Sequence, residues 1–296
     1  MNVYLLGTIL NMATILMTAG CGSFLSVKGG NFNLGGEGQV YAGGFIGALS
    51  LVAFRNLPSV IAVPLCFLIS GCAAALMALV PAFLKQYRRV DVLLSSFLIS
   101  AGVIPLIDAG IAGPFRGETN NLLATAFIPE KFVFPSILNP SRLNGTFFVA
   151  IVFCVFLFYV MTRTRLGQQL EVFGISPDFA VYSGFSDSKL TLVSVTVSGF
   201  LHGAAGFFCT AGTYATCHSG FYAGFGWNAL SVALISQSNP LFIIPSSVIL
   251  AGLTTGASQF SMMHNFGFDM GAMLQGVILF FIVFSPSVIR LIRRGK

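Results

Sequence analysis

Long apolar runs occupy most of this 296-residue chain. They cover residues 3–26, 39–54, 59–84, 92–112, 144–162, 190–215, 226–237, 241–258 and 270–290. A helix of about 20 apolar residues crosses the ~30 Å hydrocarbon core of a bilayer. Because backbone in lipid must satisfy its own hydrogen bonds, and the alternation typical of barrel strands is absent, the runs predict helices. We therefore expect an all-α, polytopic membrane bundle with about eight or nine transmembrane segments.

The composition agrees with a membrane protein and argues against other classes. Charged residues are 8% of the chain, compared with roughly 25% in soluble domains. No long hydrophilic block remains for a soluble catalytic or nucleotide-binding domain, so residues 1–296 are expected to form a single transmembrane domain. The first run has no basic n-region and no A-x-A-like cleavage site, which favours a retained span over a signal peptide. The six cysteines are scattered without metal-ligand spacing, so no metal site is expected.

The short runs GWNALSVALISQ and LFIIPSSVILAGLTTGAS are joined by SNP. Asn239 and Pro240 mark a turn, and the first run is too short to cross a bilayer upright. Residues 226–258 therefore predict a broken-helix hairpin or a tightly turned helix pair.

The net charge of +6 could suggest a nucleic-acid partner. In so apolar a chain, an excess of cations in cytoplasmic loops is the simpler explanation, and no nucleic-acid binding is expected. With the C-terminus in the cytoplasm, the inner cations are Lys28, Lys85, Arg88, Arg89, Arg163, Arg165, Lys189, Arg290, Arg293, Arg294 and Lys296. The outer cations are then Arg55, Arg116, Lys131 and Arg142. The N-terminus lies outside if residues 27–38 form a plain cytoplasmic loop, and inside if that stretch re-enters the membrane.

Two connections are long. Residues 113–143, rich in Pro and Asn, predict an external loop that serves as an outer cap or a docking surface. Residues 163–189 predict an internal loop that contains a short surface helix, with Ser176 as N-cap, Pro177 at its first position and Gly184 beyond its end.

This short helix carries aromatic residues at a helical spacing. Phe179, Tyr182 and Phe185 stand three residues apart and predict an apolar stripe. Periodicity alone leaves two partners open for that stripe, a lipid surface or a groove in another protein.

The stretch NFNLGGEGQ at residues 31–39 places polar side chains between two apolar runs. Glycine-interrupted segments at membrane depth are how many transporters expose polar groups to a solute. Asn31, Asn33, Glu37 and Gln39 are therefore candidates for a translocation pathway, and a purely structural polar knot is the alternative.

A second glycine pattern, SGFLHGAAG at residues 198–206, predicts close helix packing through Gly199, Gly203 and Gly206. His202 within it is expected to be a satisfied buried histidine rather than a proton relay.

Two further acids have structural explanations. Asp91 is expected at a cytoplasmic helix start, where the helix dipole favours it. Asp108 near an outer helix end is expected to reach water or Arg116.

Several motifs in one order resemble a known family. GGNFNLGGEGQVYAGGF, GISPDFAVYSGF, SGFLHGAAG and GFGWNALSVALISQSNPLFIIPSSVILAGLTTGA are similar to segments of the permease subunits of ATP-binding-cassette (ABC) importers. The likeness is to the branched-chain amino acid, ribose and simple-sugar permease superfamily, and within it to the nucleoside and simple-sugar group.

The resemblance implies a role for the internal loop. It makes residues 163–189 a cytoplasmic coupling loop within a single permease domain. The residues that would couple to the ATPase are Glu171, Gly174, Pro177, Phe179, Ala180, Tyr182 and Gly184. The aromatic stripe then faces protein rather than lipid.

The resemblance also implies partners, a location and a solute class. The chain would form half of a pore in the cell membrane, as a heterodimer with a homologous permease. ATPase subunits holding ATP and Mg²⁺ and an extracytoplasmic binding lipoprotein would complete the importer, so this chain would carry no catalytic residue and no cofactor. The expected solute is a nucleoside or simple sugar, with riboflavin as the alternative.

Other classes fit the sequence less well. A channel or secondary carrier would also have eight or nine helices, but a carrier is expected to show internal repeats and several intramembrane charges. A membrane enzyme would need a constellation such as H-E-x-x-H, which the three histidines and the acids do not form.

Overall fold

The structure, a computed structural model, describes residues 3–118, 122–265 and 270–281. Within these ranges the chain is built from helices and loops, with isolated β-bridges only at Ala124–His218 and Ser136–Asn144. The predicted all-α membrane bundle is confirmed.

Within the described ranges, six helices are long and apolar enough to cross a membrane. They are α1 (Val3–Lys28), α3 (Ser59–Arg88), α4 (Val92–Ala112), α5 (Thr146–Arg163), α8 (Asp187–Cys209) with its π-helical extension η2 (Thr210–Tyr214), and α10 (Ile243–Met263) preceded by η3 (Pro240–Phe242). Shorter apolar helices are α9 (Phe225–Ile235) and the helix Met270–Phe281. Helix α2 (Gly36–Ala53) is as long as α5 but is not among the six. The remaining elements are α6 (Arg165–Ile175), α7 (Pro177–Tyr182) and η1 (Glu130–Phe132).

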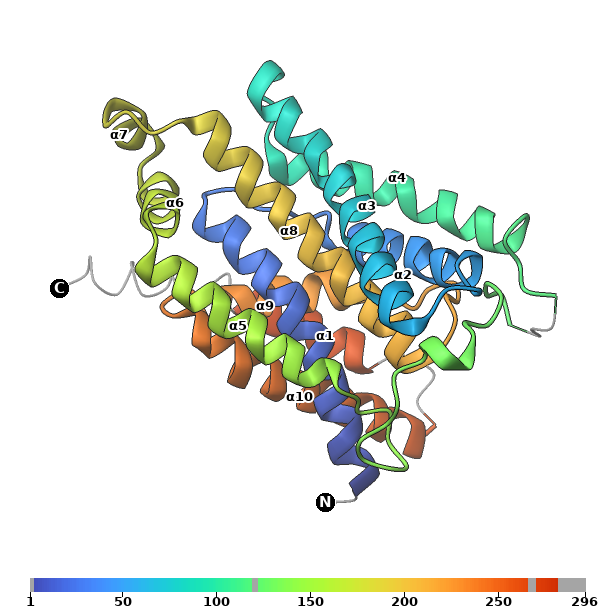
Figure 1. The fold of residues 1–296 in the computed structure, drawn as a ribbon. Coiled ribbons are helices and arrows are strands. Elements are labelled where there is room, and N and C mark those ends of the chain that lie inside the picture. Colours follow the sequence, from blue (N-terminus) through green and yellow to red (C-terminus); the bar gives the residue numbers. More distant parts are fainter. Residues whose placement is uncertain (1–2, 119–121, 266–269, 282–296) are drawn as a thin grey trace.

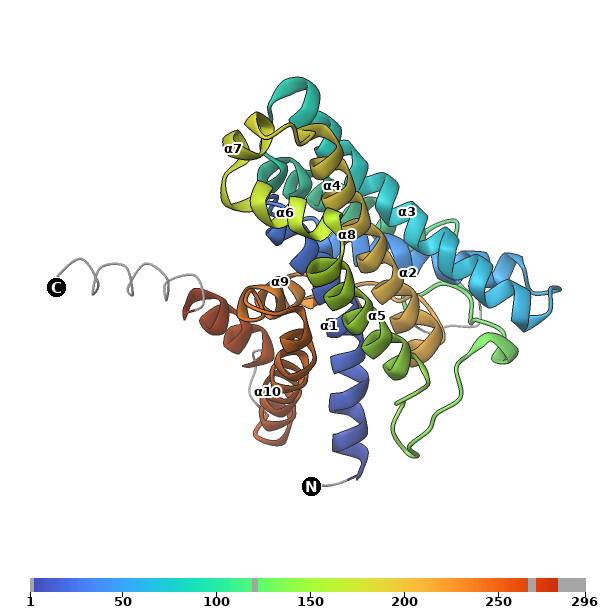
Figure 2. The ribbon, with the colours of Figure 1, turned by 60° about the vertical axis from the view of Figure 1, so that its left-hand side comes forward.

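Helices α1 and α8 form the centre of the bundle (Figure 1). Helix α8 packs against α1, α2 and α3, whereas α1 also packs against α5, α9 and α10. After a turn of the view, α2, α3 and α4 lie on one side of this pair and α9 and α10 on the other (Figure 2). Two groups of helices therefore meet along the α1–α8 axis.

Small residues let α8 approach its neighbours closely. A Cβ atom added at Gly206 would lie 2.0 Å from the Val40 carbonyl oxygen of α2. One added at Gly203 would lie 2.6 Å from the Cβ of Ala74 in α3, and one added at Gly199 would lie 2.4 Å from the Cβ of Ala78. The three glycines therefore put backbone against backbone, the packing role expected from SGFLHGAAG.

The hairpin expected at 226–258 is a turned helix pair in which only α9 is short. Helix α9 has 11 residues and α10 has 21. The Asn239 side chain accepts a hydrogen bond from the Leu241 N–H and fixes the turn. Helix α10 continues beyond the predicted end at 258 because Gly256 and the residues after it remain helical to Met263.

The segment 113–143, which the sequence predicts to be an external loop, folds onto the C-terminal end of α8. Its backbone pairs with the segment after α8, for example from the Thr125 N–H to the Cys217 carbonyl at 2.9 Å and from Ile128 to Ala215 at 2.8 Å. Phe132 of the loop is buried. In its described parts, residues 113–118 and 122–143, the loop thus caps the bundle.

The two ends of the bundle carry different cations. The end that bears α6 and α7, here called the α6–α7 end, is formed by the last residues of α1, α3 and α5 and the first of α8. It carries Lys28, Lys85, Arg88, Arg89, Arg163, Arg165 and Lys189. The opposite end carries Arg55, Arg116, Lys131 and Arg142, and Arg290, Arg293, Arg294 and Lys296 lie outside the described residues.

The start of α1 lies at the opposite end, because this 26-residue helix runs the length of the bundle to Lys28 (Figure 1). A Cβ atom added at Gly7 would touch Ser141 of the external loop. The N-terminal end of α1 and the α6–α7 end are therefore on opposite faces.

Candidate functional site

The segment between α1 and α2, residues 29–35, returns into the bundle rather than lying across its end. Gly30 has a φ of 68°, a conformation that glycine adopts without strain and that lets the chain reverse after Lys28. The Asn33 side chain then donates to the Ser198 hydroxyl at 3.1 Å, and Ser198 lies near the middle of α8. Helix α2 thus begins at roughly mid-bundle, earlier than the predicted run that starts at residue 39.

Serines of α4 receive the backbone of this segment. The Leu34 N–H donates to the Ser96 hydroxyl at 3.0 Å, and the Gly38 N–H donates to the Ser100 hydroxyl at 2.8 Å. These bonds supply acceptors for N–H groups around the start of α2, where no preceding helical turn offers a carbonyl oxygen. Re-entrant backbone is tolerated at membrane depth when it is buried in protein in this way.

Asn33 and Gln39 form a reciprocal amide pair. The Asn33 Nδ2 donates to the Gln39 Oε1 at 2.9 Å, and the Gln39 Nε2 donates to the Asn33 Oδ1 at 3.1 Å. Both side chains are buried. Asn31 is buried too, and its Nδ2 donates to Ser194 at 3.0 Å. In the structure these three predicted pathway residues are buried and hydrogen-bonded within the protein, an arrangement that favours the alternative of a polar knot.

Glu37 differs from the other three. Its carboxylate Oε1 accepts a hydrogen bond from the Gly224 N–H at 2.8 Å, and Gly224 is the N-cap of α9 with a φ of 87°. A Cβ atom added at Gly226 would lie 2.4 Å from the Glu37 backbone nitrogen. Helices α2 and α9 therefore begin against each other, and the Glu37 carboxylate caps the positive end of α9.

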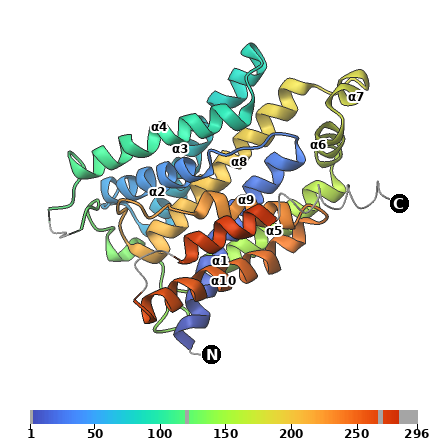
Figure 3. The ribbon, with the colours of Figure 1, turned by 180° about the vertical axis from the view of Figure 1, so that it is seen from behind.

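A cavity of about 430 Å³ opens beside Glu37. Its walls are the starts of α2 and α9 and the helix 270–281, which lies over α9 (Figure 3). The lining residues are Glu37, Gly224, Trp227, Ala272, Gln275, Gly276 and Leu279. Of the four residues expected in a translocation pathway, Glu37 alone lines this cavity.

His202 and the intramembrane acids have internal partners. The His202 Nδ1 lies 2.7 Å from the Ser198 carbonyl oxygen and its Nε2 lies 3.2 Å from the Ser23 hydroxyl, which agrees with a satisfied buried histidine. Asp108 accepts from the Tyr41 and Ser219 hydroxyls at 2.5 and 2.6 Å. Of the two partners expected for Asp108, water or Arg116, the contact with Arg116 was wrong among the described residues, because the Oδ1 of this half-buried carboxylate accepts from the two hydroxyls instead.

Asp91 has the helix-start position expected of it. It is the N-cap of α4, and its side chain accepts from the Leu93 N–H at 3.0 Å. The carboxylate is exposed at the α6–α7 end.

The α6–α7 unit is fixed to the bundle through α6. The Lys28 Nζ lies 2.8 Å from the Glu171 Oε1. A Cβ atom added at Gly174 would lie 2.1 Å from the Lys28 carbonyl oxygen, so only glycine allows this approach of α6 to the end of α1. Leu170 and Phe173 of α6 are buried. Glu171 and Gly174, both expected in a coupling loop, thus hold α6 against the chain that leads into the re-entrant segment.

Helix α7 has the predicted start and stop. Pro177 occupies its first turn after Ser176. At the other end the Phe185 N–H donates to the Ala180 carbonyl and the Gly184 N–H to the Val181 carbonyl, with Gly184 at a φ of 84°. This is a Schellman arrangement, which favours glycine at the left-handed position.

The predicted aromatic stripe is only partly present. Phe179 and Tyr182 are 60% and 92% exposed, while Ala180 is buried against the bundle. Phe185 was wrongly placed in the stripe, because the chain reverses at Gly184 and Phe185 packs against the core. Helix α7 therefore presents two aromatic side chains outward at one end of the molecule (Figure 1).

Lys85 of α3 connects the two regions. Its Nζ donates to the Asn31 Oδ1 at 2.7 Å and stands 5.6 Å from the centre of the Phe173 ring of α6. One cation therefore touches both the re-entrant segment and α6.

Residues 5–283 match the family described as "Branched-chain amino acid transport system / permease component". The chain belongs to this permease family.

Several curated proteins resemble this permease. A probable riboflavin import permease protein, RfuC of Treponema pallidum, is 31% identical over 83% of this chain and 65% of its own length. The glucose ABC transporter permease protein TsgB13 of Haloferax volcanii is 26% identical over 94% of this chain and 75% of its own length. The guanosine ABC transporter permease protein NupP of Bacillus subtilis is 23% identical over 97% of this chain and 83% of its own length.

A solved structure shares the fold. PsaBC from Streptococcus pneumoniae in complex with Fab contains a chain that is 12% identical, with a TM-score of 0.50, over 94% of this permease and 89% of that chain. At this identity the likeness concerns the fold alone.

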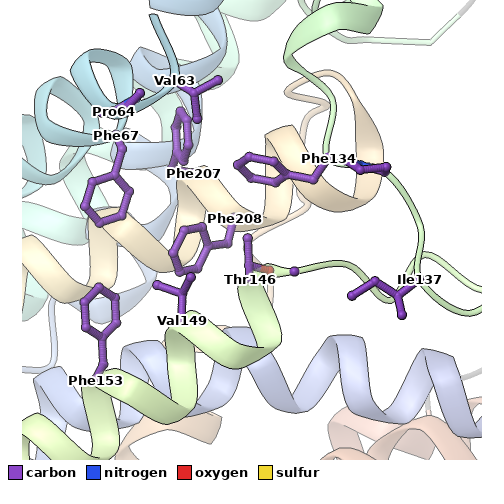
Figure 4. A pocket seen from close by; sticks show the side chains of 12 residues that line it. Val63, Pro64, Phe67, Phe134, Ile137, Thr146, Val149, Phe153, Phe207 and Phe208 are labelled. Carbon is purple, nitrogen blue, oxygen red and sulfur yellow. The ribbon is translucent and has the colours of Figure 1, made fainter. Parts of the chain in front are cut away.

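The permease also has an apolar groove. It has a volume of about 530 Å³ and lies between α3, α5, the end of α8 and the external loop (Figure 4). Phe67, Phe153, Phe207 and Phe208 line it. Thr146 is the one lining residue with a polar side chain, and its hydroxyl is bonded to Asn144 at 2.6 Å.

The serines that hold the re-entrant segment were missed in the sequence. Ser96 and Ser100 in α4 and Ser194 and Ser198 in α8 are each four residues apart, so each pair occupies one helix face. A polar face repeated at this spacing inside an apolar run was the available signal.

Proposed function

We propose that this permease is the transmembrane subunit of an ATP-driven ABC importer and forms half of its translocation pore. The α6–α7 end faces the cytoplasm of a cell membrane, which puts the cation-rich end inside as the positive-inside rule favours. The N-terminal end of α1 then faces outward, and the C-terminus lies in the cytoplasm.

The observation that carries this proposal is the outward presentation of Phe179 and Tyr182 on a helix that is anchored from behind. Large exposed aromatic side chains on a fixed element are typical anchors of a protein interface. A cytoplasmic ATPase seated there would receive them in a groove, and it would hold the ATP and Mg²⁺. Closure of two ATPases would move α6 and α7, and the ion pair at Lys28 would pass that movement to the re-entrant segment.

The solute class is proposed from the relatives. Their names assign riboflavin, glucose and guanosine to permeases with which this chain aligns over most of its length. A nucleoside or simple sugar is our main proposal, and riboflavin is the alternative. These solutes share hydroxyl groups and the absence of a permanent charge.

One chain supplies one coupling unit and one re-entrant segment within its described residues. We therefore propose a heterodimer with a homologous permease, two ATPase subunits beneath it, and an extracytoplasmic binding lipoprotein that delivers solute from above.

The test is co-expression of the permease with a candidate ABC ATPase subunit from the same organism. Tyr182→Asp should abolish both ATPase co-purification and solute uptake while the permease still inserts. Tyr87→Asp is a matched control, because Tyr87 is a 75% exposed tyrosine at the same end but in α3. Normal ATPase co-purification with Tyr182→Asp would contradict the assignment of α7.

A further inference from the structure

The cavity beside Glu37 has one face made by a single helix. Ala272, Gln275, Gly276 and Leu279 line it at positions i, i+3, i+4 and i+7, which is one face of a helix. The opposite wall is made by the starts of α2 and α9. The starts of two helices and one face of a short helix thus border this open cavity. Helix α2 begins inside the bundle after a re-entrant segment, and helix ends of this kind accompany solute sites in transporters.

Few side chains in this cavity can recognise a solute. Trp227, the single tryptophan of the chain, offers an aromatic face and one N–H donor. Gln275 offers an amide, whose Oε1 lies 2.8 Å from the position of a Cβ added at Gly224. Ala272, Gly276 and Leu279 are apolar or small. A largely apolar wall with a few polar groups and an aromatic face is the usual make-up of a small-molecule site.

The charge of the cavity decides what it can hold. The N-terminus of a broken helix ordinarily attracts a carboxylate or phosphate of the solute. Here the protein's own Glu37 carboxylate takes that place at the start of α9. Neither lysine nor arginine is among the lining residues. A second anion would therefore meet a carboxylate with no cation among the described lining residues, whereas a hydroxyl could donate to a remaining lone pair of Glu37.

We propose that this cavity is the part of the permease that contacts the solute, and that it accepts uncharged, hydroxyl-bearing solutes with a ring that stacks on Trp227. Phosphorylated counterparts are rejected by Glu37. This inference rests on the proposed importer function. It adds which residues contact the solute and why an anionic solute is excluded. Gln275 and Glu37 bond the hydroxyls, and Trp227 covers the ring face.

The experiment measures binding of radiolabelled guanosine, glucose and riboflavin to the assembled importer complex in lipid nanodiscs. Guanosine monophosphate, glucose 6-phosphate and riboflavin 5′-phosphate are the competitors. Binding of one of the three uncharged solutes is expected, with its phosphate competing at least about tenfold more weakly. Equal competition by the phosphate, or binding of none of the three, would overturn the proposal.

Variants tie that binding to the cavity. Trp227→Phe and Gln275→Leu should each weaken solute binding at least about tenfold. Glu37→Gln should reduce the difference in binding affinity between a solute and its phosphorylated counterpart. Gln237→Leu is the matched control, because Gln237 lines a different cavity at the α6–α7 end, and it should leave binding unchanged.

The outcomes separate this inference from the proposed function. If Trp227→Phe and Gln275→Leu both assemble with the ATPase and bind solute as the unchanged complex does, the solute site is elsewhere and the importer assignment still stands. If the unchanged permease neither assembles with an ATPase nor supports uptake, the importer assignment itself fails.

Discussion

The Lys28 ammonium lies 2.8 Å from the Glu171 carboxylate and thereby joins the last turn of α1 to α6. Both side chains are partly exposed, so the pair contributes about 0–1 kcal/mol to stability. In the proposed importer, its position between α6 and the re-entrant segment would let it transmit movement from the ATPase. Lys28→Glu and Glu171→Lys should each lower uptake per ATP hydrolysed, and the combined charge swap should restore it.

That prediction is checked with paired uptake and ATPase assays on the complex. Lys189→Glu, at the same end in α8, is the control and should leave the ratio unchanged. A swap that fails to recover coupling would show that the ion pair transmits nothing.

Gly206 is the tightest small-residue contact of α8. Gly206→Val should destabilise the bundle by about 1–3 kcal/mol or more, because its side chain would enter the Val40 backbone. The measurement is the loss of monodisperse protein on heating in detergent. Gly102→Ala in α4 is the control, since nothing lies within 4 Å of an added Cβ there. An unchanged melting temperature for Gly206→Val would contradict the packing described.

The left-handed Gly184 ends α7. Gly184→Ala should cost roughly 1–2 kcal/mol locally, because a Cβ disfavours a positive φ. We expect reduced ATPase co-purification with normal insertion, whereas Gly184→Asn should retain more association since asparagine tolerates this conformation. Gly145→Ala, at a helix start with a φ of −59°, should have no effect. Equal co-purification of the Ala and Asn variants would argue against a role for this backbone geometry.

A substitution in the Asn33–Gln39 pair distinguishes a structural role of these residues from a role in the translocation pathway. Asn33→Leu leaves the Gln39 amide and the Gly35 N–H without a partner, at a cost of about 1–3 kcal/mol for each buried group. Thermal stability of the purified protein should fall, while the solute affinity of the folded fraction stays the same. Weaker solute binding at unchanged stability would instead place Asn33 in the pathway.

Membrane orientation can be tested with single cysteines. Lys131→Cys and Lys189→Cys lie at opposite ends of the bundle. In intact cells a membrane-impermeant maleimide should label the cysteine at 131 and leave that at 189 unlabelled until the membrane is opened. The reverse pattern would invert the proposed topology.

Much of the fold was accessible from the sequence because lipid simplifies the prediction. Uninterrupted apolar runs such as 59–84 and 92–112 have one stable state in a bilayer, and they correspond to α3 and α4. The start and stop of α7 were predicted from Pro177 and Gly184 for a similar reason, since both residues have local backbone effects that tertiary contacts seldom override.

Hydrogen-bond partners that lie on different helices could not be predicted from the sequence in this way. The start of α2 at Gly36 depends on hydroxyls from α4, and the partners of Asp108 come from α2 and from Ser219. Helical periodicity within one segment carries no information about such contacts. Phe185 failed for a related reason, because the backbone reversal at Gly184 ends the helical register that placed it with Phe179.

The close contacts of α8 also bear on which parts of the protein can move. The Ser70 hydroxyl of α3 donates to the carbonyls of Gly43 in α2 and Gly203 in α8, at 2.6 and 3.0 Å, where the three backbones meet. Helices joined this closely cannot slide past one another without steric overlap. Helices α2, α3 and α8 would therefore move together as one rigid body. Any opening and closing of a pore would then occur at its borders, where α9, α10 and the helix 270–281 lie on the other side of α1.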